Sequence, residues 1–216
     1  MKFLIVFREN GISKEVVYET FWARYSYKSA RDNLNTVVYR LRKIFGEGND
    51  FISTDMNVIK LREGTYSIDV DSFNRYIDLG KAAERKKESE TALQYYSKAG
   101  DLYKGDFLES GLYLDFIRDE RENLRNKYKQ LLFNIIKISL DLENYADTNS
   151  WANKLISFDP ICEPAYRLLM ISSALTGNRN EITRIYSKLK TTLMDNYNIT
   201  PDIKTVNLKT KLLQQT

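Results

Sequence analysis

Residues 29–46 (SARDNLNTVVYRLRKIFG) carry side chains suited to binding nucleic acid. Asp32 is the only acid between Arg24 and Glu47, whereas a merely solvated helix usually interleaves acids with its cations. Amides, hydroxyls and guanidiniums hydrogen-bond base edges and phosphate oxygens, so the polar side of this segment is a candidate DNA contact. That side comprises Lys28, Asp32, Asn35, Thr36, Tyr39, Arg42 and Lys43, with Arg31 and Arg40 on its flanks.

The spacing of apolar residues predicts that this segment is a helix. The apolar residues recur at steps of three and four, so on a helix they form one buried stripe: Ala30, Leu34, Val37, Leu41 and Ile44. Ser29 is expected to cap the first turn, and Gly46 is expected to end the helix in the left-handed conformation. The polar side would then face solvent, and an ordinary solvated surface is the alternative interpretation.

The composition argues against enzyme chemistry. The chain has no histidine and a single cysteine, Cys162, which excludes zinc sites and Cys–His or Ser–His nucleophiles. Carboxylate or lysine chemistry stays open, but no Gly-rich phosphate loop accompanies the acids. We therefore expect a protein that is not an enzyme and that holds no metal or cofactor.

Cysteine usage and apolar patterning favour the cytoplasm. A single cysteine permits no internal disulfide, which fits a reducing compartment. No apolar run reaches the ~18 residues of a membrane span. The apolar stretch Met1–Phe7 is short and is followed by no small-residue cleavage site. We expect cytoplasmic localisation without membrane contact.

The N-terminal segments follow the order of a winged helix-turn-helix. Three predicted helices precede two β-prone stretches that form a predicted hairpin, and these segments cover residues 1–10, 14–23 and 29–46, then 51–54 and 58–61. Residues 1–66 contain 11 Lys/Arg and 8 Asp/Glu, against 22 and 21 in the remainder. The basic excess is therefore concentrated in the part that contains the candidate DNA-contacting helix.

The sequence from Tyr66 onward is helical and contains a repeat. The stretches ENYADTNSWANKLISFDP and GNRNEITRIYSKLKTTLMD align at a shift of 34 residues. The shift superposes Asn144 on Asn178, Lys154 on Lys188 and Leu155 on Leu189. A 34-residue period of paired helices is typical of tetratricopeptide repeats, and a plain helical bundle is the alternative.

Several phrases of the sequence resemble one family, the bacterial transcriptional activator domain of the SARP-type regulators. The segment SARDNLNTVVYRLRKIFG resembles its recognition helix, with an Ala-Arg-x-x-Leu start, a Leu-Arg pair and a closing Gly. Further matches, in the family's order, are TYSIDVDSFNRYI, LYKGDFLE, FIRDERENLRNKY and NYNITPDIKT. In the last of these, Asn198 stands where the family usually has glycine, and asparagine tolerates the left-handed conformation.

The resemblance implies a mainly α fold in two parts. Residues 1–65 would form an OmpR-like winged helix-turn-helix with a β-hairpin wing, and residues 66–216 a tetratricopeptide-like helical domain. The family's winged helix opens with a four-stranded sheet, which this sequence lacks, so the winged helix is expected to be truncated. We therefore expect Phe3, Leu4 and Phe7 to be partly exposed.

The resemblance also implies a transcriptional regulator that binds double-stranded DNA with residues 29–45 in the major groove. Asn35, Thr36 and Tyr39 are expected to contact base edges. Arg40 and Arg42 match the family's DNA-contacting region. Arg31, Lys43 and Lys60 are expected to contact phosphates. The helical domain is expected to self-associate into a homo-oligomer or to contact RNA polymerase or another regulator.

Two features leave a second function open. The strands with which the family's winged helix opens are missing, and Asp55 near the wing tip would repel the DNA backbone. Arg40 and Arg42 also have an alternative role as partners of carboxylates in the helical domain. The chain would then be a tetratricopeptide-like protein-interaction scaffold with a degenerate winged helix that does not bind DNA.

Overall fold

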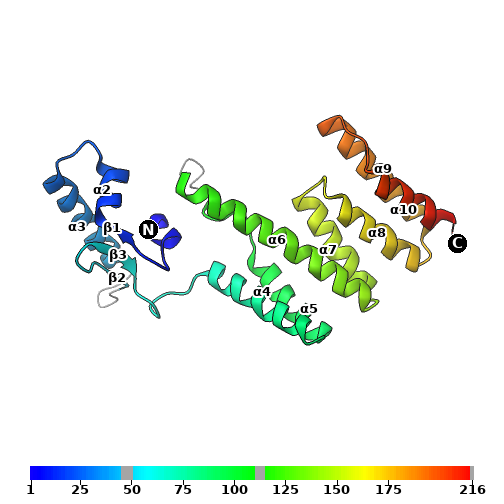
Figure 1. Ribbon diagram of the computed structural model, residues 1–216, viewed down its shortest axis with the longest axis horizontal. Helices are drawn as coiled ribbons and strands as arrows, with labels where there is room; N and C mark the ends of the chain where they lie inside the picture. Colours follow the sequence, from blue (N-terminus) through cyan, green and yellow to red (C-terminus); the bar gives the residue numbers. More distant parts are fainter. Residues whose placement is uncertain (45–50, 110–114, 215–216) are drawn as a thin grey trace. The chain divides into compact units, whose positions relative to one another are not determined.

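The computed structural model describes residues 1–44, 51–109 and 115–214 (Figure 1). Helices dominate it and are accompanied by one small sheet, which confirms the expected mainly α fold class. The backbone contacts define two units. The first contains Met1–Ile68 and Phe107–Arg121, and the second contains Asp69–Asp106 and Glu122–Thr216. The predicted boundary after residue 65 lies close to the observed break after Ile68, whereas the grouping of Phe107–Arg121 with the first unit was not predicted.

The first unit contains the expected winged helix-turn-helix elements. Its helices are α1 (Lys2–Val6), α2 (Lys14–Trp22) and α3 (Tyr27–Ile44), and its strands are β1 (Ile12–Ser13), β2 (Ile52–Ser53) and β3 (Val58–Leu61). The strands form an antiparallel sheet in the order β1-β3-β2, in which β3 pairs with both neighbours. The hairpin of β2 and β3 was predicted, but β1 was not, because two residues are too short to show a period-2 pattern.

Gly11 lets the chain enter β1 close to β3. Its φ is +69°, and a Cβ built there would lie 2.8 Å from the Cγ1 of Val58. Glycine is therefore needed both for the left-handed conformation and for the close approach of the two strands.

The core of the first unit includes residues that were expected to be partly exposed. Phe3 and Leu4 are only 7% and 6% exposed, and Phe7 packs against the same core while staying partly buried. The expectation for Phe3 and Leu4 was therefore wrong, because α1 packs against β3 and covers them. The remaining core residues are Ile12, Val17, Tyr18, Ala30, Leu34, Val38, Phe51, Ile52, Ile59 and Leu61.

Helix α3 differs from its prediction in its start and in part of its buried stripe. It begins at Tyr27 rather than after a Ser29 cap, and the Ser26 hydroxyl accepts the Ser29 backbone N–H at 3.2 Å. Val38 is buried in place of Val37, which is 40% exposed. Ile44, also predicted to be buried, is 74% exposed. The predicted end of the helix, Phe45 and Gly46, lies outside the described residues.

An open apolar cavity explains the exposure of Val37. The cavity has a volume of about 190 Å³, and its walls come from α1, α2, α3 and β3. Val37 and Leu41 line it from α3, and Phe21 and Trp22 line it from α2. The predicted stripe therefore faces partly into the packed core and partly into this cavity.

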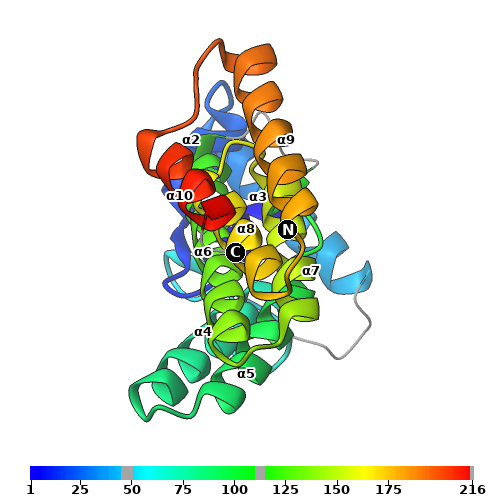
Figure 2. The same ribbon diagram turned by 90° about the vertical axis from the view of Figure 1, so that its right-hand side faces the viewer.

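The second unit is a series of packed helices (Figure 1 and Figure 2). They are α4 (Asp69–Arg85), α5 (Ser89–Leu102), α7 (Tyr145–Phe158), α8 (Glu163–Leu175), α9 (Arg179–Tyr197) and α10 (Ile203–Gln214), while α6 (Asp115–Asp141) contributes to both units. Helix α4 packs against α5, α7 against α8, and α8 against α9, as in paired-helix repeats. Helix α10 packs against α8 and α9 and closes the series.

Matching helix caps confirm the repeat found in the sequence. The Asn144 side chain accepts the backbone N–H of Asp147 at the start of α7, and Asn178 accepts that of Glu181 at the start of α9. These two asparagines are the residues that the 34-residue shift superposes. At the end of α9, Asn198 adopts the left-handed conformation with φ 52°, as expected for the glycine-like position.

Candidate nucleic-acid interface

The solvent side of α3 presents most of the predicted DNA-contacting residues together. They are Arg31, Asn35, Thr36, Tyr39, Arg40 and Lys43, and all are exposed. Tyr39 is the most prominent of the large side chains, at 66% exposure. This side is opposite Ala30, Leu34 and Val38, which anchor the helix in the core. The helix therefore holds its polar side outward through its buried stripe.

This side of α3 is electropositive. Asp32 is the only acid in the helix, and its Oδ1 lies 3.5 Å from the Nε of Arg31 in an exposed ion pair. Such exposed pairs contribute little, about 0–1 kcal/mol, so Arg31 can exchange this partner for a phosphate at small cost. Among the described residues, no hydrogen bond or ion pair engages Arg40 or Lys43, and both cations are available to a ligand.

The Arg42 side chain makes a structural contact within the first unit and does not extend into solvent. Its Nη2 donates to the backbone carbonyl of Ile52 at 2.7 Å, and its side chain is half-buried. The bond joins α3 to β2, so Arg42 supports the wing from behind the solvent side. This geometry does not favour the DNA contact predicted for Arg42.

Lys60 and the wing tip occupy different parts of the hairpin. Lys60 is exposed on β3, opposite Ser53 of β2, where its ammonium is available to a phosphate. The tip itself holds Asp55, whose Oδ2 accepts the Ser53 hydroxyl at 2.5 Å, and the fully exposed Met56. An acidic and apolar tip does not suit a phosphate backbone.

Two residues at the start of α2 fix the wing tip. The Lys14 ammonium donates to the carbonyls of Met56 at 2.6 Å and Thr54 at 3.3 Å. The Asn57 side chain donates to the Glu15 carboxylate at 2.6 Å. The sequence contained no signal for these contacts, because the partners are at least forty positions apart.

Aromatic residues before and at the start of α3 also lie on the surface and were not predicted as site residues. Tyr25 and Tyr27 are 61% and 63% exposed, and the Tyr27 ring meets the Tyr18 ring edge-on at 5.3 Å. Arg24 and Lys28 beside them are exposed as well. Residues 24–28 (RYSYK) are therefore an exposed mixture of cations and tyrosines.

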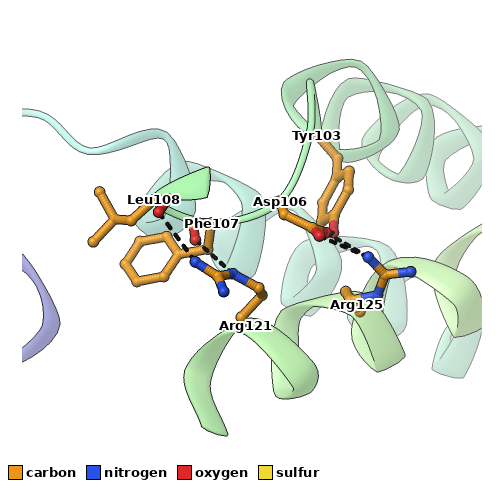
Figure 3. Close-up of polar contacts among 6 residues, drawn as sticks. All are labelled: Tyr103, Asp106, Phe107, Leu108, Arg121 and Arg125. Atoms are coloured by element: carbon orange, nitrogen blue, oxygen red, sulfur yellow. Dashed lines mark hydrogen bonds and ion pairs between the residues drawn. The ribbon is translucent and has the colours of Figure 1, made fainter. Parts of the chain in front are cut away.

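The connector phrase LYKGDFLE is held by arginines of α6, as Figure 3 shows. Arg121 donates to the carbonyls of Phe107 at 3.0 Å and Leu108 at 3.1 Å, and Leu108 has a positive φ of 49°. Arg125 donates to both carboxylate oxygens of Asp106, at 2.8 and 2.7 Å. In the matched phrases, Arg121 and Arg125 therefore have structural roles.

Tyr103 belongs to the same connector and packs against α6. Its hydroxyl donates to the Oδ1 of Asp106 at 3.2 Å, and its ring stacks on Tyr128 with centroids 3.9 Å apart. Burial, with the Asp106 carboxylate adding to it, raises the pKa of Tyr103 to about 12. The phenol is thus kept neutral and serves as a packed hydrogen-bond donor.

Two further observations concern metal ligands and membrane-spanning helices in the described residues. Residues 1–44, 51–109 and 115–214 contain no group of three or more metal-ligating side chains placed to hold an ion. No helix in the same ranges has the length and apolar character needed to cross a membrane.

Comparison with solved structures supports the two-part fold. EmbR of Mycobacterium tuberculosis, solved in complex with a low-affinity phosphopeptide, matches with a TM-score of 0.78 and 18% identity. The match covers 99% of this chain and 57% of the EmbR chain, so this chain spans little more than half of EmbR. The TPR domain of Arabidopsis OM64 matches 69% of this chain and 100% of its own, with 11% identity and a TM-score of 0.45.

Sequence comparisons decide the family. No curated protein matches the chain. The model of the bacterial transcriptional activator domain matches residues 68–213, which is more than half of the sequence and covers the helical series from the residue before α4 into α10. The chain therefore belongs to the bacterial transcriptional activator domain family.

Proposed function

We propose that this member of the family is a transcriptional regulator that binds double-stranded DNA through α3. The supporting observation is the outward side of α3, where Arg40 and Lys43 are exposed and unpaired in the described part of the chain. Amide, hydroxyl and phenol groups stand between them at Asn35, Thr36 and Tyr39, in a pattern suited to base edges. Neutralisation of the DNA phosphate charges by the cations would supply most of the affinity. The uncharged side chains of Asn35, Thr36 and Tyr39 would set the sequence preference.

The helical domain has a different role in this proposal. It contacts RNA polymerase or another regulator, or joins a second copy of the chain into a homo-oligomer. The protein acts in the cytoplasm, is not an enzyme and uses no cofactor. The family membership supports a regulatory role, and the paired helices supply surfaces for protein contacts.

Salt dependence of DNA binding tests the proposal directly. Four exposed cations, Arg31, Arg40, Lys43 and Lys60, are placed to meet phosphates. With a slope of about −0.9 per phosphate contact, log K against log salt should have a slope between roughly −2 and −4 for a random duplex. Fluorescence anisotropy with a labelled duplex at 50 to 200 mM salt gives this slope. Absence of binding at 50 mM salt would refute the proposal.

A matched pair of double variants localises the contact. Arg40→Ala with Lys43→Ala should weaken binding at least tenfold and reduce the salt slope by about two. The control, Lys86→Ala with Lys137→Ala, removes two exposed cations from the helical domain and should leave both quantities nearly unchanged. Equal losses in the two double variants would mean that net charge, rather than α3, governs binding.

The wing tip favours the alternative function. Its exposed groups are Asp55 and Met56, and Lys14 is already engaged by the tip carbonyls. A protein-interaction scaffold without DNA binding would have such a tip and would show no association with duplex DNA at any salt concentration. The same titration therefore separates the two functions.

A further inference from the structure

The α4–α5 hairpin carries a group of four side chains that the fold does not use for packing between repeats. We call Arg75, Tyr76, Tyr95 and Lys98 the tyrosine–cation cluster. The Tyr76 and Tyr95 rings stack with centroids 6.4 Å apart and planes inclined by 24°. The Lys98 ammonium lies 5.9 Å from one ring centroid and 5.8 Å from the other, and the Arg75 guanidinium lies 5.4 Å from that of Tyr76.

The two cations of the cluster are not neutralised. Both are exposed, and within the described residues neither forms an ion pair with a carboxylate. Elsewhere in the same hairpin, Lys81 does pair with a carboxylate, that of Asp78 at 3.9 Å. Attraction to a ring face does not cancel the charge of a cation, so Arg75 and Lys98 stay available to an anionic ligand.

The surface beside the cluster is apolar. Both tyrosines are only partly buried, and Leu79, one turn after Tyr76 on α4, is 38% exposed. Phenol rings that carry a polar hydroxyl and an apolar face are the side chains that recur in protein-contact sites. The buried side of the hairpin is separate, because Gly80 and Tyr96 pack against each other there.

We infer that the tyrosine–cation cluster binds an acidic protein segment with interspersed apolar side chains. Carboxylates of the segment would meet Arg75, Lys98 and the tyrosine hydroxyls, and its apolar side chains would pack on the rings and on Leu79. Charge complementarity selects this partner, because two unpaired cations repel a basic segment and attract an acidic one. The inference rests on the proposed protein-contact role of the helical domain and specifies the chemistry of the partner.

A labelled peptide tests the inference on the full chain. The probe is a fluorescein-labelled 12-residue peptide of aspartates with leucine at every third position, and its counterpart has lysine in place of aspartate. We expect anisotropy at 50 mM salt to show binding of the acidic peptide only. Arg75→Gln with Lys98→Gln should weaken binding by roughly five- to thirtyfold, from two exposed charge contacts. Glutamine is a good helix former, so the hairpin should keep its fold.

The control removes the same charge from the same hairpin. Lys81→Gln with Lys86→Gln should change the dissociation constant less than about twofold. No binding of the acidic peptide, or equal losses in both double variants, would overturn the inference. Duplex binding measured on the same proteins distinguishes this test from that of the proposed function. The Arg75→Gln, Lys98→Gln variant should bind DNA as the unmodified chain does. If the unmodified chain did not bind DNA, the proposed function would be rejected, whether or not the acidic peptide bound.

Discussion

Replacing Arg42 with alanine should destabilise the first unit and leave the solvent side of α3 in place. The guanidinium donates to the Ile52 carbonyl at 2.7 Å from a half-buried position. A hydrogen bond from a charged donor contributes ~1.5–3 kcal/mol, and partial exposure places the expected loss near the lower limit, about 1.5 kcal/mol. The same change at the exposed Arg40 should alter the free energy of unfolding by less than about 0.5 kcal/mol.

The two tryptophans of the chain make the first unit observable by itself. Trp22 packs against the core of the first unit, whereas Trp151 belongs to α7. In a Trp151→Phe background, urea unfolding followed by tryptophan fluorescence reports the first unit. With a denaturant slope of about 1–1.5 kcal/mol/M, Arg42→Ala should lower the midpoint by roughly 1 M. Arg40→Ala is the matched control and should leave the midpoint unchanged.

Arg40→Ala should weaken DNA binding more than Arg42→Ala does, which is the opposite of their expected effects on stability. At 10 °C and without urea, Arg42→Ala should retain affinity within about threefold, because its contact lies inside the unit. Arg40→Ala should lose roughly five- to thirtyfold, the effect of one good contact to a base or phosphate. If Arg42→Ala abolished binding while the Trp22 transition stayed unchanged, Arg42 would belong to the DNA-contacting side and the structural reasoning would fail.

Three further changes test the helical domain. Gly80→Ala should destabilise it by about 1–3 kcal/mol in urea unfolding, because a Cβ there meets the Tyr96 ring. Asn178→Ala should cost about 1 kcal/mol in the same assay through loss of the α9 cap, and an unchanged midpoint would show that the cap adds nothing. Burial raises the pKa of Tyr128 to about 12, above the ordinary value of 10. Stability from this group is complete below pH 10 and is lost as the pH rises to about 12, so thermal unfolding midpoints should fall across that interval and a Tyr128→Phe variant should show a smaller fall.

The helical part was predictable because each of its signals is local. The 3.6-residue spacing of apolar positions marks a helix wherever one side is buried, and the asparagine caps recur at the shift that aligns α7 with α9. The left-handed Asn198 followed from the tolerance of asparagine for that conformation. None of these inferences requires knowledge of a residue distant in the sequence.

Several differences between the predictions and the structure of the first unit concern contacts between distant segments. Val38 is buried rather than Val37 because the neighbouring elements leave an open cavity beside Val37, and spacing alone does not distinguish the two. Strand β1 exists because β3 pairs with it, and Ile12 lies opposite Ile59, forty-seven positions further along the chain. Arg42 was indistinguishable from Arg40 in the sequence, since both stand in one Tyr-Arg-Leu-Arg stretch, and only the position of β2 separates them.

The division between Arg40 and Arg42 changes how the interface should be understood. In the proposed interface, Arg40 contributes charge, whereas Arg42, which is bonded to the wing, helps to fix where that charge is presented. Lys14 acts on the wing in the same way, because its ammonium is engaged by the tip carbonyls. With the tip held and Asp55 and Met56 exposed there, the cations proposed to meet phosphates lie on α3 and at Lys60 of β3. Sequence preference should therefore depend on Asn35, Thr36 and Tyr39 rather than on the wing.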